Sequence, residues 1–306
     1  MSDIIDFLKN EGVSESILND VRDFRQSYKV SPEMEKRIPS PRYNYYGTEI
    51  WEEALSTILA GENLLLVGPK ATGKNVLAEG LSQAFGRPQW DISLYVNTDA
   101  ASLIGTDTFK NGEVSLRKGP ILKCAEEGGF GILDEVNMAK NESLAVLHAT
   151  LDFRRVIDVP GYDRIELNEA TRFIGTMNYG YAGTREINEA LASRFMIIQM
   201  PVITEENLKK LIASNFPSLK DEFVAQFAEL FSEIRKKCEG GEISTKALDL
   251  RGLLSAIHMM ENGLGVNAAL QLGIVNKCFD SYERQLVDDI ITVRFPKNLK
   301  RDKIFK

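Results

Sequence analysis

The sequence has few cysteines and no long apolar run. Its three cysteines, Cys124, Cys238 and Cys278, are odd in number and lie far apart, so they fit neither a disulfide framework nor a Cys-x-x-Cys zinc site. No stretch approaches the roughly 20 apolar residues that cross a bilayer. The start, MSDIIDFLKNEG, is acidic where a signal peptide would be basic and then apolar. We therefore expect a cytoplasmic protein without membrane insertion.

Basic residues are fewer than acidic ones. The 44 acidic residues outnumber the 37 basic ones and give a formal net charge of -7, which argues against a general attraction to nucleic acid or anionic membranes. One basic cluster lies in the last ten residues, and we expect it to be a solvated terminus. The two histidines, His148 and His258, lie in helical stretches without a partner at metal-ligand spacing, so packing or surface roles are expected for them.

The chain of 306 residues is long enough for roughly two domains at about 150 residues each. Residues 1–42 carry apolar positions at helical spacing and then a break at Pro39 and Pro41, which predicts an N-terminal helical extension and linker. In residues 43–201, helical stretches alternate with short apolar runs at 64–67, 92–95, 130–133, 173–176 and 196–200. Strands that alternate with helices predict an α/β domain with a parallel sheet.

After Pro201 the strand pattern stops. Residues 202–296 have helical periodicity throughout, which predicts a second, all-helical domain, and residues 297–306 form the basic tail.

A phosphate-binding motif follows the first apolar run. The residues that form it are Gly68, Pro69, Lys70, Ala71, Thr72, Gly73, Lys74, Asn75 and Val76. They match the P-loop pattern GxxxxGK between a strand and a helix, where glycines let the backbone approach phosphate oxygens and Lys74 adds a positive charge. The position after Lys74 holds Asn75 in place of the usual Ser or Thr, whose hydroxyl binds Mg²⁺. Our hypothesis is that Asn75 preserves magnesium binding with altered affinity, and the alternative is that hydrolysis is crippled.

Two acidic residues end the apolar run at 130–133. A carboxylate pair at the carboxyl edge of a sheet is what a magnesium-dependent nucleoside triphosphatase needs. Asp134 would hold Mg²⁺ through its water shell, and Glu135 would act as the general base for the attacking water.

Four motifs in order resemble one family. GPKATGKN, LIGTDTF, RKGPILKCAEEGGFGILDEVNMA and RFIGTMNYGYAGTREINEALASRF look like the MoxR branch of the AAA+ ATPases, close to the type that activates nitric oxide reductase and Rubisco. The match covers about residues 43–290. The resemblance implies a P-loop AAA+ core with a parallel five-stranded sheet, a helix-2 insert and a pre-sensor-1 hairpin, followed by an all-helical lid domain.

The resemblance also assigns residues to roles. Asn178 matches sensor 1, which orients the attacking water between Glu135 and the γ-phosphate of ATP. Arg194 in Ala-Ser-Arg-Phe matches the arginine finger, which reaches the neighbouring subunit's nucleotide; Arg185 is a weaker competitor, and a surface salt bridge is the ordinary alternative. Arg251 matches sensor 2 of the lid, with Lys246 as its rival.

Two segments resemble the hairpins of the family. The turn sequence Lys-Asn-Gly-Glu at 110–113 fits the helix-2 insert, and residues 154–167 alternate about a Pro-Gly turn before sensor 1. Contact with a client protein and simple hairpins remain equal alternatives for these segments. The upstream Tyr43, Tyr45 and Tyr46 could border the adenine, although ordinary packing is the more common role of such residues.

The leading hypothesis is an ATPase that uses ATP and Mg²⁺, assembles with itself into a ring, expected to be a hexamer, and remodels or activates a client protein. By analogy with the family, a von Willebrand factor A domain protein is an expected partner. The alternatives are an AAA+ motor subunit that acts on nucleic acid, which the acidic charge disfavours, and a nucleotide-binding switch with little turnover because of Asn75.

Overall fold

The computed structural model describes residues 3–110, 112–179, 186–296 and 299–306. The chain forms two compact units: unit 1 is Met1–Pro69 with Gly73–Pro201, and unit 2 is Lys70–Thr72 with Val202–Lys306. No helix within the described ranges is both long enough and apolar enough to cross a membrane.

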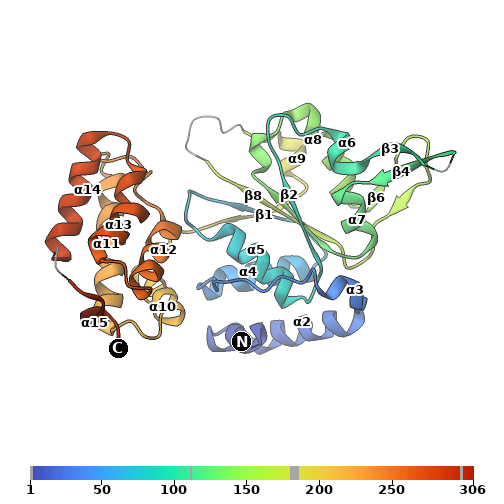
Figure 1. Ribbon diagram of the computed structural model, residues 1–306. Helices are drawn as coiled ribbons and strands as arrows, with labels where there is room; N and C mark the ends of the chain where they lie inside the picture. Colours follow the sequence, from blue (N-terminus) through green and yellow to red (C-terminus); the bar gives the residue numbers. More distant parts are fainter. Residues whose placement is uncertain (1–2, 111, 180–185, 297–298) are drawn as a thin grey trace. The chain divides into compact units, whose positions relative to one another are not determined.

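Unit 1 is built on a five-stranded parallel sheet in the order β2-β5-β8-β1-β9 (Figure 1). The strands are β1 (Leu64–Val67), β2 (Gln89–Ser93), β5 (Phe130–Asp134), β8 (Arg172–Met177) and β9 (Met196–Gln199). Alternate residues of β1 face two different cores, with Leu64 and Leu66 in one and Leu65 and Val67 in the other. The sheet is therefore buried on both faces, as expected for parallel strands.

Helices cover each face of this sheet (Figure 1). One face carries α4 (Thr48–Leu59) and α5 (Lys74–Ala84), and the helices α1 (Ile4–Asn10) and α2 (Glu15–Ser27) pack outside them. The other face carries α6 (Ala100–Ile104), α7 (Pro120–Glu126), α8 (Asn141–Thr150) and α9 (Glu189–Ala192). The short α3 (Pro32–Glu35) and the 3-10 turn η1 (Val136–Met138) complete the elements of unit 1 outside its hairpins.

The five predicted strands are present, and one of them is displaced. The sequence placed the second strand at 92–95, whereas β2 begins at Gln89. Gln89 is polar, so the apolar pattern does not mark the start of β2. Its side chain is nevertheless buried, and its Nε2 donates to Asp91 Oδ1 at 2.7 Å.

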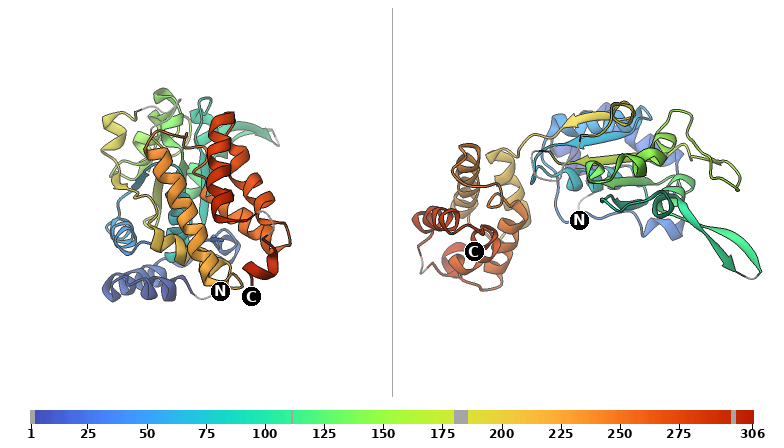
Figure 2. Two further views of the ribbon diagram at one scale, coloured as in Figure 1. Left: turned by 90° about the vertical axis from the view of Figure 1, so that its left-hand side faces the viewer. Right: turned by 90° about the horizontal axis from the view of Figure 1, so that it is seen from above.

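Both predicted hairpins are present. The antiparallel strands β3 (Gly105–Lys110) and β4 (Glu113–Lys118) interrupt the helical segment between α6 and α7, and this hairpin projects from unit 1 (Figure 2). The second hairpin has strands of two residues each, β6 (Val156–Ile157) and β7 (Ile165–Glu166), directly before β8. The fold class implied by the resemblance is therefore confirmed for unit 1.

The N-terminal helices belong to the core of unit 1. Leu18, Val21 and Phe24 lie on one face of α2 at spacings of three, are buried, and join the cluster that contains α4 and α5. Arg25 fastens α2 to the carboxyl end of α5, where Nε donates to Ala84 O at 2.7 Å. The sequence predicts an extension and linker over residues 1–42, whereas their helices pack as part of unit 1.

Truncating a side chain in this helix should therefore destabilise unit 1. Leu18 is fully buried, so Leu18→Ala should lower the free energy of unfolding by about 2–5 kcal/mol, the usual cost of such a cavity. The matched control is Asp20→Ala on the exposed side of α2, which should change it by less than about 0.5 kcal/mol. Denaturant unfolding followed by circular dichroism measures both. Equal stability of Leu18→Ala and the wild type would show that the N-terminal helices are not part of the core.

Unit 2 is helical apart from its connections and one isolated bridge. Its elements are α10 (Glu205–Asn215), α11 (Asp221–Glu239), α12 (Leu250–Glu261), α13 (Val266–Gly273), η2 (Val275–Lys277), α14 (Ser281–Arg294) and α15 (Arg301–Ile304). The helices α12 and α13 approach most closely at Gly252 and Gly273, where a Cβ on either residue would collide with the carbonyl oxygen of the other. Only glycine fits at this crossing. The all-helical unit agrees with the predicted fold class.

The end of the chain is not a solvated terminus. Ile304 and Phe305 are buried, and Phe305 forms a β-bridge with Leu219. Lys220 N donates to Ile304 O at 3.0 Å. The prediction of a solvated tail was wrong because it rested on the basic residues, whose described side chains stay exposed while the apolar pair between them packs against the helical unit.

Candidate active site

The P-loop connects β1 to α5. Gly73 adopts a left-handed conformation with φ 84° immediately before the helix. A Cβ on Gly73 would lie 2.9 Å from Cδ2 of Tyr45, so both the backbone angle and this close ring require glycine. Tyr45 is buried, and burial, with a smaller contribution from Glu53, raises its pKa to about 12. Its ring packs against the loop, which is the ordinary role that the sequence analysis weighed for it.

Lys74 is the first residue of α5 and is buried. Its Nζ donates to Gly68 O at 2.9 Å and to Pro69 O at 2.8 Å, so the ammonium group is held under the loop. Burial lowers its pKa to about 8, and the nearby Asp134 and Glu135 oppose this shift. Phosphate oxygens would supply the negative charge that this partly desolvated ammonium group needs.

Two acidic residues lie at the carboxyl end of β5, and β8 supports them. Thr176 Oγ1 on β8 donates to Asp134 Oδ1 at 2.5 Å and accepts from Glu135 N at 3.2 Å. Thr176 is only 1 % exposed, so this hydroxyl fixes the acidic turn from inside the sheet. Glu135 has a left-handed backbone with φ 57°, which costs a non-glycine residue about 1–2 kcal/mol and is typical of functional turns.

Asn178 lies just beyond the end of β8, and its side chain faces Glu135. Its Nδ2 donates to Glu135 Oε1 at 3.3 Å. The buried Asn137 in η1 donates through Nδ2 to Asn178 O at 2.7 Å and so holds the backbone of Asn178. The structure thus brings Lys74, Asp134, Glu135 and Asn178 together at one edge of the sheet.

Thr176 and Asn137 are not among the site residues that the sequence motifs predict. Both are buried polar residues in otherwise apolar surroundings, which is the signal that could have found them. Buried polar groups need hydrogen-bond partners, and here the partners are the atoms that shape the site.

The predicted magnesium ligands are Asn75 and Asp134. Asn75 is half-buried in the first turn of α5. Within the described residues, no group of three or more His, Cys, Asp or Glu side chains is arranged to hold a metal ion alone. Magnesium often binds through one or two protein oxygens together with water and substrate phosphates, and these two side chains fit that kind of site.

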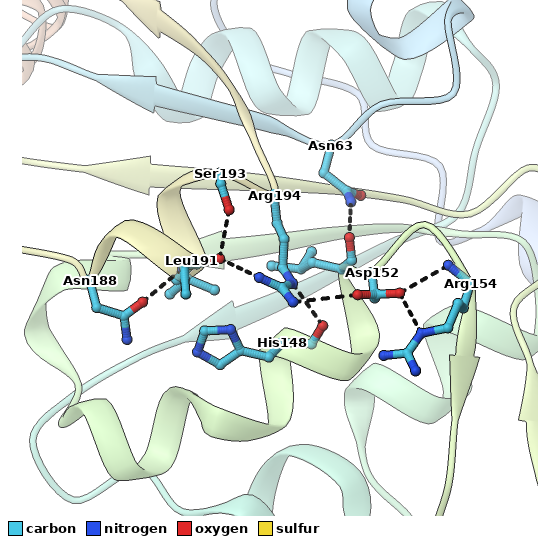
Figure 3. Close-up of polar contacts among 10 residues, drawn as sticks. Asn63, His148, Asp152, Arg154, Asn188, Leu191, Ser193 and Arg194 are labelled. Carbon is cyan, nitrogen blue, oxygen red and sulfur yellow. Dashed lines mark hydrogen bonds and ion pairs between the residues drawn. The ribbon is translucent and has the colours of Figure 1, made fainter.

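Arg194 lies in the segment after α9 and makes contacts within its own chain (Figure 3). Its Nε donates to His148 O at 3.1 Å, Nη1 donates to Ala190 O, and Nη2 lies 3.4 Å from Asp152 Oδ2. In the single chain this arginine is therefore in a salt bridge, the ordinary alternative that the sequence analysis named. Its rival Arg185 lies outside the described residues.

The two sensor 2 candidates belong to unit 2. Arg251 is exposed in the first turn of α12, whereas Lys246 lies over the ring of Phe279 with Nζ 5.5 Å from the ring centroid. A cation–π contact retains Lys246 within its own unit. The assignment of sensor 2 to Arg251 stays a prediction.

Comparison of the sequence with known proteins identifies the family of this chain. Residues 63–195 match the family model described as AAA domain (dynein-related subfamily). The chain is 34 % identical over 285 residues to "Uncharacterized protein YojN" of Bacillus subtilis (strain 168), covering 90 % of this chain and 93 % of the relative. It is 32 % identical over 253 residues to "Uncharacterized protein SSP1341" of Staphylococcus saprophyticus, covering 80 % of this chain and 95 % of the relative. The chain belongs to the dynein-related subfamily of AAA domain proteins.

Proposed function

We propose that the chain is an ATPase of the MoxR type that hydrolyses ATP to ADP and phosphate and uses this reaction to remodel, assemble or activate a client protein. The observation that carries this proposal is the cluster of Lys74, Asp134, Glu135 and Asn178 at one sheet edge, in which Thr176 binds the two acidic residues.

Each residue has a role that its position supports. The loop amides and Lys74 bind the β- and γ-phosphates. Glu135 accepts a proton from the attacking water, and Asn178, which donates to Glu135 Oε1, orients the carboxylate and the water. Asp134 and Asn75 would hold Mg²⁺, which neutralises charge on the phosphates. Thr176 keeps Asp134 in place because it donates to one of its oxygens.

We also propose a ring of identical chains, six by resemblance to the family, in which Arg194 of one copy completes the site of the next. Arg251 would sense the nucleotide from the helical unit. A single copy would lack the positive charge that stabilises the transition state, so turnover would depend on assembly.

The client surface in this proposal is the β3–β4 hairpin. Phe109 and Val114 are paired across it and are 76 % and 63 % exposed, which is unusual for apolar side chains on a projecting hairpin. Tyr162 Oη donates to Asp107 Oδ1 at 2.6 Å and so links this hairpin to the β6–β7 loop. Adding a client protein together with a von Willebrand factor A domain protein should raise the rate of ATP turnover. A rate that the added protein leaves unchanged would count against that protein as client.

The magnesium dependence of ATP turnover tests hydrolysis and the role of Asn75. An amide oxygen lies one bond further from the backbone than a hydroxyl, so the wild type should need several-fold more Mg²⁺ for half-maximal turnover than Asn75→Thr. Phosphate release measured over a magnesium titration compares the two proteins. If the wild type releases no phosphate at any magnesium concentration while Asn75→Thr does, hydrolysis by the natural chain is excluded and a nucleotide-binding switch remains.

A further inference from the structure

The guanidinium group of Arg194 is held on three sides, as Figure 3 shows. Two of its contacts are carbonyl oxygens in the last turns of two helices, His148 O in α8 and Ala190 O in α9. The third is the carboxylate of Asp152, which follows the end of α8. Carbonyls at helix carboxyl ends attract cations, so the position suits an arginine.

These contacts leave part of the guanidinium group available. An arginine has five N–H groups in a planar fork, and the contacts described engage one on each of its three nitrogens. Among the residues that the structure describes, two N–H groups on the terminal nitrogens have no hydrogen-bond partner. The side chain is 26 % exposed, so the group is oriented by its own chain without being enclosed by it. A fork held in this way can still bind an anion with two parallel hydrogen bonds.

Asp152 is not needed for Arg194 to cap the ends of the two helices, because the carbonyl oxygens alone provide that contact. Its side chain is 10 % exposed, and its Oδ1 accepts from Arg154 Nε at 2.7 Å and from Arg154 N at 3.1 Å. Its other oxygen, Oδ2, faces Arg194. The hydrogen bonds from Arg154, and to a smaller extent the charge of Arg194, hold the pKa of Asp152 below its usual value, so the carboxylate is charged. Two guanidinium groups around one carboxylate leave a net charge of +1 beside the surface.

We propose that Asp152 is the positioning residue for Arg194: it fixes the orientation of the guanidinium group that completes the neighbouring copy's site, and Arg154 anchors the carboxylate. This inference rests on the proposed function, in which Arg194 acts on the nucleotide of another copy. Its physical basis is that a long, flexible side chain loses less freedom on reaching the transition state when its orientation is already set.

Three single variants test the positioning. Asp152→Asn removes the charge and should lower kcat about tenfold with the KM for ATP changed less than about twofold, because the nucleotide pocket of the same chain is untouched. Asp152→Glu restores a carboxylate and should return kcat to within about threefold of the wild type. The control is Asp163→Asn, which removes an exposed charge from the loop between β6 and β7 and should leave kcat unchanged.

Mixed assemblies then separate positioning from a local structural defect. Asp152→Asn chains are mixed with an equal amount of Glu135→Gln chains, which cannot turn over ATP but carry an intact Arg194 and Asp152. Turnover per Asp152→Asn chain should rise about threefold or more over the unmixed variant, because some of its sites now face a correctly held Arg194. A chain that carries both substitutions should not rescue Asp152→Asn. Native mass confirms assembly in each mixture.

The same mixture with Arg194→Ala in place of Asp152→Asn distinguishes the two proposals. If Arg194→Ala is rescued and Asp152→Asn is not, Asp152 does not act through Arg194 and the inference is overturned while the proposed function stands. If neither is rescued, Arg194 does not act on a neighbouring copy and both fail. Should Asp152→Asn not assemble, Asp152→Glu decides: an assembled Asp152→Glu ring that has lost tenfold or more in kcat overturns the inference, and near-normal kcat supports it.

Discussion

Replacing Glu135 by Gln is expected to lower ATP turnover by about 10²–10⁴-fold while ATP still binds, because glutamine has the same shape but cannot accept the proton of the attacking water. The structure indicates that Glu135→Gln removes the proton acceptor without disturbing the surrounding contacts. Asn178 Nδ2 donates to Glu135 Oε1, and an amide oxygen can accept the same hydrogen bond. Glu135 is exposed, so the substitution buries no unpaired group.

Phosphate release under single and multiple turnover, together with ATP affinity, measures this expectation. The matched control is Glu166→Gln, an exposed glutamate on β7 away from the site, which should behave as the wild type. A Glu135→Gln protein that hydrolyses ATP at the normal rate would show that another group is the general base.

Replacing Arg194 by Ala is the second large expected effect. The loss of a guanidinium group that stabilises charge on the transferred phosphate should lower kcat by about 10³-fold or more. The affinity for ATP should change only a few-fold, because in the proposed site Lys74 and the loop amides of the same chain bind the phosphates. The result would be a protein that binds ATP and assembles but scarcely turns over.

The measurement compares kcat, ATP affinity and native mass of Arg194→Ala with those of Arg164→Ala, an exposed arginine in the loop between β6 and β7. Arg164→Ala should retain the wild-type kcat. An Arg194→Ala protein with normal kcat would show that Arg194 acts only through its contacts with His148, Ala190 and Asp152 in its own chain.

The sequence predicted the strands of the sheet because its signals are local. Four of the five strands lie where short apolar runs predicted them, and the glycine pattern placed the P-loop directly after β1. The carboxyl ends of parallel strands meet at one edge, so Asp134 at the end of β5 and Asn178 just beyond β8 had to lie near each other.

The remaining features depend on packing that a linear pattern does not contain. Thr176 is an ordinary strand residue until β8 pairs beside β5, where its hydroxyl reaches Asp134. Ile304 and Phe305 are a short apolar pair in a basic segment, and only the bridge to Leu219 shows that they pack. Residue motifs also named Arg194 but could not show that Asp152 holds it, because the two residues are 42 positions apart.

In the proposed ring, each copy completes the active site of another. ATP turnover per chain and native mass, measured on the same wild-type samples over a dilution series, test it most directly. Turnover per chain should fall to background as the assembly separates into single chains. Single chains that hydrolyse ATP at the full rate would contradict it.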